Sequence, residues 1–258
     1  MDLGLSERVV LVTGGSAGLG FALVDRLLDE GARVAFCGRD PRRLAAAQTK
    51  LARHGGACLA VRADVRSVDQ LEGFVRAAEE TFGGVDALVN NAGSAAGGEF
   101  EANDDAYWQA DLDAKLMSAV RASRLVIPRL RSRGGGSILN VLSVWARTPG
   151  AGSTPSSVSR AAGLALTKAL SHECGRDGIR VNAVLIGILR STQWEAAAER
   201  QGVSPEQFYC DVAAEYAIPL GAVGAAEDFA DLGAFLLSRR ATYVSGAAIN
   251  LDGGLSLA

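Results

Sequence analysis

The chain has 258 residues, of which 48% are hydrophobic and 21% charged, and its formal net charge is -3. This length suits one large α/β domain or two small ones, and the apolar fraction is sufficient for a sizeable core. The basic residues are scattered, which argues against nucleic-acid binding, and no apolar stretch is long enough to cross a membrane. The four cysteines lie far apart without a CxxC pair, so we expect reduced thiols in a cytoplasmic protein.

Strand-like and helical segments alternate along the chain. Short apolar, β-branched runs predict strands at 9–13, 33–37, 57–61, 87–90, 137–142, 180–184 and 247–250. Helix-length stretches begin near Leu19, Pro41, Val68, Asp104, Pro155 and Ala226. This alternation predicts an α/β, doubly wound Rossmann fold with a seven-stranded, mostly parallel sheet and helices on both faces. No linker divides the chain, so we expect one dinucleotide-binding domain over residues 1–258.

The segment at about 190–224 breaks the alternation. It carries Trp194, Phe208, Tyr209 and Tyr216 in a helical, partly apolar context. An insertion after the carboxyl end of a strand lies where open α/β sheets bind ligands. We interpret the segment as a lid over an apolar or aromatic substrate. Helices that only cover the core are the alternative.

A glycine-rich turn follows the first predicted strand. Gly14, Gly18 and Gly20 stand in the run TGGSAGLG, directly before a helical pattern. Glycine permits a tight turn and close backbone approach, and the helix N-terminus offers free N–H groups to a pyrophosphate. This position between strand and helix predicts a dinucleotide site rather than a plain glycine turn.

The turn resembles the TGxxxGxG motif of the short-chain dehydrogenase/reductase family, in particular its 3-oxoacyl-(acyl carrier protein) reductase-like members. Further matches follow in the family's order: ADV at 63–65, NNAG at 90–93, IRVNAV at 179–184 and LDGG at 251–254. The resemblance implies a nicotinamide dinucleotide, held by residues at the ends of successive strands. These are Gly14, Ser16, Gly18, Leu19, Gly20, Asp64, Val65, Asn91, Ala92, Gly93, Arg160, Gly187 and Leu189.

The end of the second strand bears on the choice of cofactor. It reads Gly38-Arg39-Asp40, whereas NAD-specific relatives would carry an acid at the Gly38 position to bind the ribose 2′-OH. Arg39 instead offers a charge-assisted fork to a 2′-phosphate. We therefore predict NADP(H) rather than NAD(H). A solvated loop charge is the alternative for Arg39.

The family's catalytic positions hold unusual residues. The resemblance implies a serine, an acid–base tyrosine, a lysine four residues after it and an asparagine on the preceding helix. Those positions are occupied by Ser143, Ser156, Arg160 and Lys115 respectively. An aliphatic hydroxyl is a far weaker acid than a phenol, whose pKa is about 10, and an arginine stays charged. Ser143 is interpreted as a substrate contact or a loop residue, and Ser156 as an active-site hydroxyl or a helix cap after Pro155.

Lys115 is the candidate replacement for the missing proton donor. It lies one helical turn from Leu112 and Ala119, on a stripe that would face inward. A partly buried lysine has a lowered pKa and can act as an acid. We hypothesise that Lys115 donates a proton or stabilises a substrate oxygen. An exposed i,i+4 ion pair with Asp111 is the alternative.

These residues predict an atypical NADP(H)-dependent oxidoreductase that reduces or oxidises the carbonyl or alcohol of a small substrate. The same groups would suit a non-redox cyclase, dehydratase or isomerase, and a catalytically silent dinucleotide-binding protein is a further alternative. The resemblance implies a homodimer or homotetramer assembled through helices near 104–130 and 155–173. No metal site and no nucleic-acid or membrane partner is expected.

Overall fold

Seven parallel strands form one sheet in the order β3-β2-β1-β4-β5-β6-β7. The computed structural model describes residues 1–257, and for residues 192–196 it describes the backbone only. The strands are β1 (Val9–Thr13), β2 (Arg33–Gly38), β3 (Cys58–Arg62), β4 (Ala87–Asn90), β5 (Gly136–Ser143), β6 (Ile179–Ile186) and β7 (Ala248–Leu251). All six strand pairs are parallel, so the predicted Rossmann architecture is confirmed.

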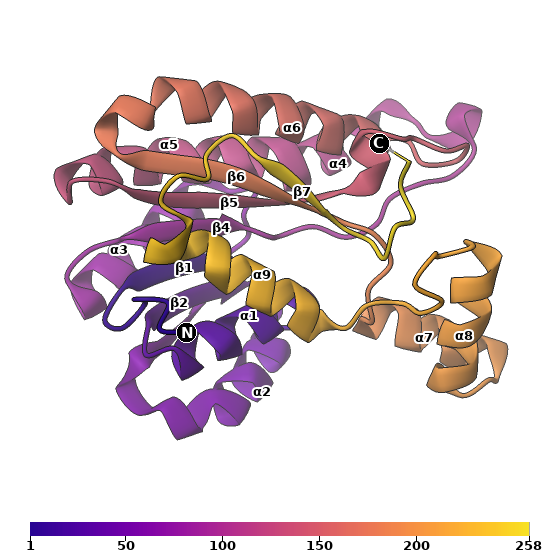
Figure 1. The fold of residues 1–258 in the computed structure, drawn as a ribbon, viewed down its shortest axis with the longest axis horizontal. Helices are drawn as coiled ribbons and strands as arrows, with labels where there is room; N and C mark the ends of the chain where they lie inside the picture. Colours follow the sequence, from indigo (N-terminus) through magenta and orange to yellow (C-terminus); the bar gives the residue numbers. More distant parts are fainter. Residues whose placement is uncertain (258) are drawn as a thin grey trace.

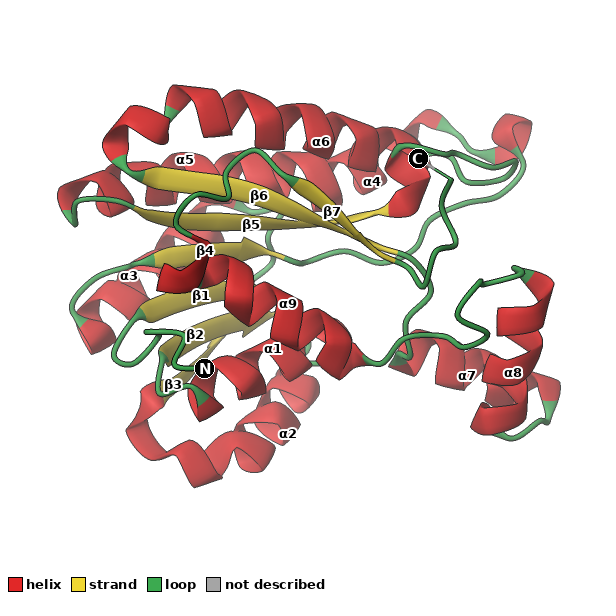
Figure 2. Cartoon of the chain, in the orientation of Figure 1, coloured by secondary structure: helices red, strands yellow, loops and turns green. Residues whose placement is uncertain are grey.

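Helices cover both faces of this sheet (Figures 1 and 2). One face carries α1 (Gly18–Asp29), α2 (Pro41–Leu51) and α9 (Ala226–Leu237). The other carries α3 (Val68–Phe82), α4 (Asp105–Leu112), α5 (Ser118–Ser132) and α6 (Ser156–Glu173). Each face has its own apolar core, and all five residues of β1 are buried. Burial on both faces explains the continuous apolar runs of the central strands.

Local signals fix several helix starts where they were predicted. Asp40 caps α2, because its Oδ1 accepts a hydrogen bond of 2.8 Å from the backbone N–H of Arg42, and Pro41 occupies the first helical position. Ser67 caps α3 in the same way. None of the helices within residues 1–257 is long and apolar enough to span a bilayer.

The long helix expected from Asp104 is interrupted. After α4 ends at Leu112, one π-helical turn spans Asp113–Met117, and α5 continues from Ser118. A π-turn inserts one extra residue per turn, so it changes which side chains face the sheet. Asp111, Lys115 and Ser118 are buried, while Leu112 is only half-buried. The predicted inward stripe therefore contains Lys115 and Ala119, but it passes through Asp111 rather than Leu112.

The segment at 190–224 forms a separate small unit at one edge of the sheet (Figure 1). It contains α7 (Thr192–Gln201) and α8 (Pro205–Glu215), and Ile188, Phe208 and Tyr209 belong to its own apolar cluster. Its two ends are joined, because Leu189 pairs with Gly224 and Arg190 N donates to Gly224 O over 2.9 Å. The chain therefore enters and leaves the inserted unit at neighbouring positions.

The strand order reverses between β1 and β4. In open α/β sheets, ligands bind in the crevice outside the carboxyl ends of the strands at this reversal. The glycine turn follows β1 and the NNAG segment follows β4, so the topology brings both predicted motifs to this crevice.

Candidate functional site

The glycine turn after β1 packs too tightly for larger residues. A Cβ atom on Gly20 would collide with the carbonyl oxygen of Gly14 and with Nδ2 of Asn91. Gly18 has φ +55°, a left-handed conformation that favours glycine, and a Cβ there would meet no atom within 4 Å. Gly20 therefore allows the turn to pack tightly against Asn91, and Gly18 leaves open space beside the turn.

Hydrogen bonds of Thr13 hold the NNAG segment against this turn. The Thr13 hydroxyl accepts the backbone N–H of Asn91 over 3.0 Å and that of Ala92 over 3.1 Å. The side-chain amide of Asn91 donates back to the carbonyl oxygens of Thr13 (2.9 Å) and Gly14 (3.0 Å). Thr13 was not among the predicted site residues, although it opens the TGGS run. Its hydroxyl holds together the ends of two strands that are distant in sequence.

The residues at this crevice fit a dinucleotide. Helix α1 begins at Gly18 without a side-chain cap, so its first-turn N–H groups have no partner inside the helix. Together with the helix dipole they favour a pyrophosphate, and the open face of Gly18 lets it approach. Ser16 and Leu19 flank the opening and are half-buried.

The ends of β2 and β3 present charged groups beside the crevice. Arg39 is exposed, and its positive charge contributes to a lowered pKa of Asp64. The larger cause of that lowered pKa is Arg66, whose Nη2 lies 2.6 Å from Asp64 Oδ2. The carboxylate of Asp64, one of the expected cofactor-binding residues, is therefore engaged by a guanidinium, while the neighbouring Val65 is buried. A Cβ on Gly38 would lie 2.8 Å from Ser16 Oγ, so an acid at that position would crowd the turn.

A buried polar cluster lies where α4, the π-turn and α6 meet. The Nζ atom of Lys115 pairs with Oδ1 of Asp111 and donates a hydrogen bond of 2.7 Å to Ser156 Oγ. Ser159 Oγ donates to the other carboxylate oxygen, Asp111 Oδ2, over 2.6 Å. The alternative of an exposed ion pair is wrong in one respect, because the side chains of Lys115 and Asp111 are only 2% and 3% exposed. Their i,i+4 pairing is present but buried.

Ser156 begins helix α6 and does not cap it. The N-cap is Pro155, which makes no side-chain cap bond, so the predicted capping alternative for Ser156 is wrong. The hydroxyl oxygen of Ser156 accepts a hydrogen bond from the Lys115 ammonium instead. Since an ammonium group is the donor, the hydroxyl keeps its own proton available for a further acceptor.

Arg160 lies one turn further along α6. Its Nη1 donates to the carbonyl oxygen of Val141 over 2.6 Å, and its Nη2 lies 2.8 Å from the position of a Cβ on Gly93. Burial lowers the pKa of Arg160 to about 10, so the guanidinium stays charged at neutral pH. Burial also lowers the pKa of Lys115. The hydrogen bond that Lys115 donates to Asp111 opposes that lowering of the pKa, and the charge of Arg160 adds to it.

Ser143 ends β5 and begins a short turn. Its hydroxyl accepts the backbone N–H of Trp145 over 3.4 Å, which corresponds to the loop interpretation, and it is only half-buried. On the next strand, Gly187 N donates to Leu251 O over 2.9 Å, and Leu189 is buried at the start of the inserted unit. The predicted residues after β5 and β6 thus lie at the same edge of the sheet as the glycine turn.

The four tyrosines of the chain lie in different surroundings. The hydroxyl of Tyr107 donates to Gly97 O over 3.3 Å, that of Tyr209 donates to Ser191 O over 3.4 Å, and Tyr243 is fully exposed. Tyr216 packs against Trp145, with ring centroids 6.4 Å apart.

Phe208 and Tyr209 are buried within the inserted unit, so they stabilise it rather than line an open surface. The side chain of Trp194 lies outside the described residues.

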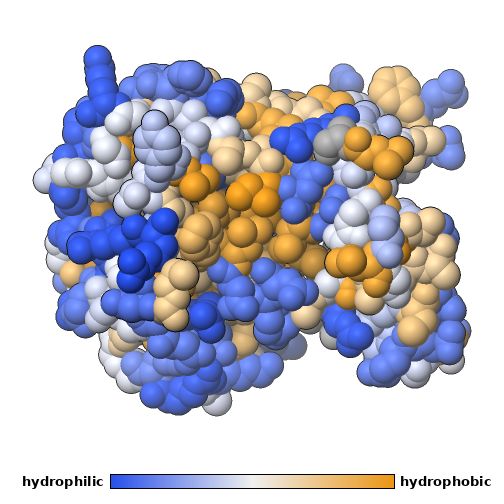
Figure 3. Space-filling view, viewed as in Figure 1, coloured by the Kyte–Doolittle hydropathy of each residue, from blue (hydrophilic) through white to orange (hydrophobic). Residues whose placement is uncertain are grey.

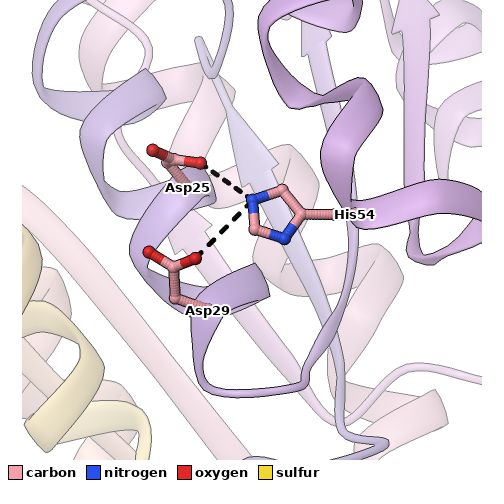
Figure 4. A group of neighbouring side chains, drawn as sticks. All are labelled: Asp25, Asp29 and His54. Atoms are coloured by element: carbon pink, nitrogen blue, oxygen red, sulfur yellow. Dashed lines mark hydrogen bonds and ion pairs between the residues drawn. The ribbon is translucent and has the colours of Figure 1, made fainter.

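One cluster of possible metal ligands lies away from this crevice (Figure 4). His54 Nε2 lies 3.0 Å from Asp25 Oδ1 and 3.8 Å from Asp29 Oδ1. The guanidinium of Arg53 also contacts both carboxylates, at 2.7 and 3.6 Å. Asp25 and Asp29 are therefore already paired with the Arg53 guanidinium, and the cluster is an ion-pair group at the protein surface.

The parallel sheet, the glycine turn and the fastened NNAG segment define a nicotinamide-dinucleotide-binding oxidoreductase. The chain belongs to the short-chain dehydrogenase/reductase family: residues 14–256 match the family model described as enoyl-(acyl carrier protein) reductase. An uncharacterized oxidoreductase of Mycobacterium bovis is 32% identical over 252 residues, which cover 97% of each chain.

Two solved structures resemble the whole chain. An NADPH-bound short chain oxidoreductase of Pseudomonas aeruginosa PAO1, described as containing an atypical catalytic center, is 37% identical with a TM-score of 0.94, and the match covers 99% of both chains. L-sorbose reductase of Gluconobacter frateurii, solved with NADPH and L-sorbose, is 32% identical with a TM-score of 0.94 over 100% of both chains. The family resemblance is confirmed, and so is the coarser prediction of a short-chain oxidoreductase.

Proposed function

We propose that this protein is an NADP(H)-dependent carbonyl reductase or alcohol dehydrogenase in which Lys115, acting with Ser156, replaces the family's tyrosine as proton donor. The contact of 2.7 Å between Lys115 Nζ and Ser156 Oγ carries this proposal. It couples a buried cation to a hydroxyl at the position where the resemblance implies the acid–base group.

The preference for NADP(H) rests on Arg39 and Gly38. Arg39 is exposed beside the crevice, and its fork of donors suits a 2′-phosphate. An acid at position 38, which would bind a ribose 2′-OH, would crowd Ser16. Both solved relatives described above contain NADPH, which supports the same choice.

When bound, the nicotinamide supplies or accepts the hydride. The side chains of the protein stabilise the charge on the substrate oxygen and transfer a proton to it. Ser156 gives its hydroxyl proton to the substrate oxygen and receives one from the Lys115 ammonium, which leaves a neutral amine. In the oxidation direction the same atoms move the proton in reverse, with the neutral amine as the base.

Arg160 and Ser143 complete the proposed site. The guanidinium of Arg160, held by Val141 O and lying against Gly93, adds a second positive charge beside Lys115 and is placed to hold the ribose hydroxyls. Two cations against the single carboxylate of Asp111 leave a net positive charge, which stabilises a developing oxyanion. Ser143 orients the substrate oxygen from the end of β5.

The lid at 190–224 is proposed to select an apolar or aromatic substrate. Tyr216 of this segment meets Trp145, two residues after Ser143. The pair places two aromatic rings near Ser143 in the chain, and aromatic rings bind other rings by offset or edge contacts.

A homodimer or homotetramer is proposed to form through α5 and α6. These helices border an apolar groove of about 250 Å³ that includes Val120, Ile127, Pro128, Leu166 and Leu170. A second region of apolar side chains is visible between α9 and β7 (Figure 3). Apolar surfaces of this kind mark interaction sites.

The test compares Lys115→Ala with two controls. Lys168→Ala removes an ammonium from α6, and Tyr216→Phe removes the hydroxyl of the tyrosine that packs against Trp145. With a panel of ketones, the loss of NADPH absorbance measures turnover, and NADPH fluorescence measures binding. We expect Lys115→Ala to lower kcat by at least about tenfold with NADPH binding retained, and both controls to stay within about threefold.

Two results would contradict the proposal. An unchanged rate in Lys115→Ala removes Lys115 from the mechanism, and a large loss in Tyr216→Phe assigns the proton to that phenol. Product analysis by mass spectrometry separates the non-redox alternative, because a cyclase, dehydratase or isomerase would leave NADPH unconsumed.

A further inference from the structure

We infer that Asp111 is the positioning residue of this site: its carboxylate holds the Lys115 ammonium against Ser156 and keeps it protonated in a buried environment. This inference rests on the proposed function, because it concerns how the proposed proton donor is maintained. Neither the family resemblance nor the sequence pattern assigns Asp111 such a role.

The geometry joins three structural elements through one carboxylate. Asp111 lies in the last turn of α4, and its Oδ1 pairs with Lys115 on the π-turn. Its Oδ2 accepts the hydroxyl of Ser159 on α6 over 2.6 Å. Ser159 Oγ also lies 3.0 Å from the carbonyl oxygen of Ser156, so the carboxylate is bound one turn from the hydroxyl that Lys115 contacts.

The charges around Lys115 make this carboxylate necessary. Among the described residues, the charged groups that act on Lys115 are Asp111 from α4 and Arg160 from α6, and Asp111 alone of these favours the ammonium form. Ser156, which accepts a second hydrogen bond from Lys115, is an uncharged hydroxyl. Without the carboxylate, burial and the Arg160 charge would both favour the neutral amine, which cannot supply the proton for reduction.

A merely structural role would have a different signature. An Asp111 that only joins α4 to α6 through Ser159 would affect unfolding but not the titration of Lys115. The two roles are separable because the carboxylate uses one oxygen for each partner.

The experiment measures the Lys115 pKa directly in the cofactor-free protein. The chain contains three lysines, Lys50, Lys115 and Lys168, so 13C-labelled lysine gives three assignable Cε titration curves by NMR. Asp111→Asn keeps the shape of the side chain and removes its charge. We expect the Lys115 pKa to fall by roughly one to three units, since an opposite charge at contact distance shifts a pKa by that amount. The Lys50 and Lys168 curves should not move.

Ser159→Ala is the matched control, because it removes the other bond of the carboxylate and leaves the charge in place. It should move the Lys115 curve by less than about half a unit. An unchanged Lys115 titration in Asp111→Asn would overturn the inference. If Asp111→Asn does not fold, the double variant Asp111→Asn/Lys115→Met should fold, since no unpaired ammonium remains. Failure of the double variant would instead assign Asp111 to the Ser159 contact and overturn the inference.

Steady-state kinetics distinguishes this inference from the proposed function. If both hold, Asp111→Asn lowers kcat at pH 8 and moves the alkaline limb of the reduction profile to lower pH, with the KM for NADPH unchanged. If the NMR shift is found but Lys115→Ala retains full activity, Asp111 sets the charge of Lys115 and the proposed function fails alone.

Discussion

The turn after β1 and the cluster at the start of α6 hold polar groups in different ways. At the turn, the polar atoms offered to a ligand belong to the backbone, and glycines let them approach. At the cluster, the polar atoms belong to the side chains of Lys115, Asp111 and Ser156, which are packed against one another. A backbone site depends on the spacing of its glycines, whereas a side-chain site can hold different residues as long as each buried charged group keeps a partner.

The largest effect is expected from a change at the turn. Gly20→Ala places a Cβ against the Gly14 carbonyl and the Asn91 amide, and neither can move without breaking the hydrogen bond that the amide donates to that carbonyl. We expect a destabilisation of about 1–3 kcal/mol and loss of NADPH binding, measured by thermal unfolding and fluorescence titration. Gly73→Ala is the control, because a Cβ there meets nothing within 4 Å. Full NADPH binding by Gly20→Ala would show that the turn is not as tight as described.

Charge reversal at Arg39 tests the cofactor preference. Arg39→Glu should weaken NADPH binding by roughly ten- to a hundredfold and leave NADH binding nearly unchanged, because the lost contact is a charge-assisted hydrogen bond. Arg76→Glu, on the exposed surface of α3, is the control for net charge. Equal losses for both cofactors would show that Arg39 does not contact the 2′-phosphate.

The pH dependence of turnover tests the charge state of the cluster. Burial lowers the pKa of Lys115, so the ammonium is lost as pH rises through a value below the usual one of about 10.4. The kcat for carbonyl reduction should therefore fall with rising pH, and the kcat for alcohol oxidation should rise over the same range. Lys115→Met should abolish both the fall in the reduction kcat and the rise in the oxidation kcat with pH. A reduction rate that stays constant up to pH 10 would contradict this assignment.

The smallest effect is expected at the lid. Tyr216→Ala removes the partner of Trp145 but leaves the buried residues of the inserted unit in place, so stability should change little. We expect the KM for ring-containing ketones to rise by about three- to tenfold, with kcat nearly constant, because one aromatic contact contributes about 0.5–1.5 kcal/mol. An equal rise for short aliphatic ketones would argue against selection of rings by this pair.

The same contrast explains how far the sequence could predict the structure. Strands β1 and β4 have the predicted bounds, because apolar runs end at glycine and asparagine motifs. The π-turn at Asp113–Met117 has no comparable sequence signal, so the inward face was assigned to Leu112 rather than Asp111. Contacts between distant segments, such as Lys115 with Ser156 or Ser159 with Asp111, depend on side-chain packing that periodicity does not encode.

The most direct test of the central claim is chemical rescue of Lys115→Ala. The variant leaves a cavity at the position of an ammonium that contacts Ser156 Oγ over 2.7 Å, and small alkylammonium ions such as methylammonium can fill it. We predict that the NADPH-dependent rate of Lys115→Ala rises with methylammonium concentration, while the rates of the wild-type protein and of Ser156→Ala do not respond. A Lys115→Ala rate that is insensitive to added amines, in a variant that still binds NADPH, would contradict the assignment of Lys115 as the proton donor.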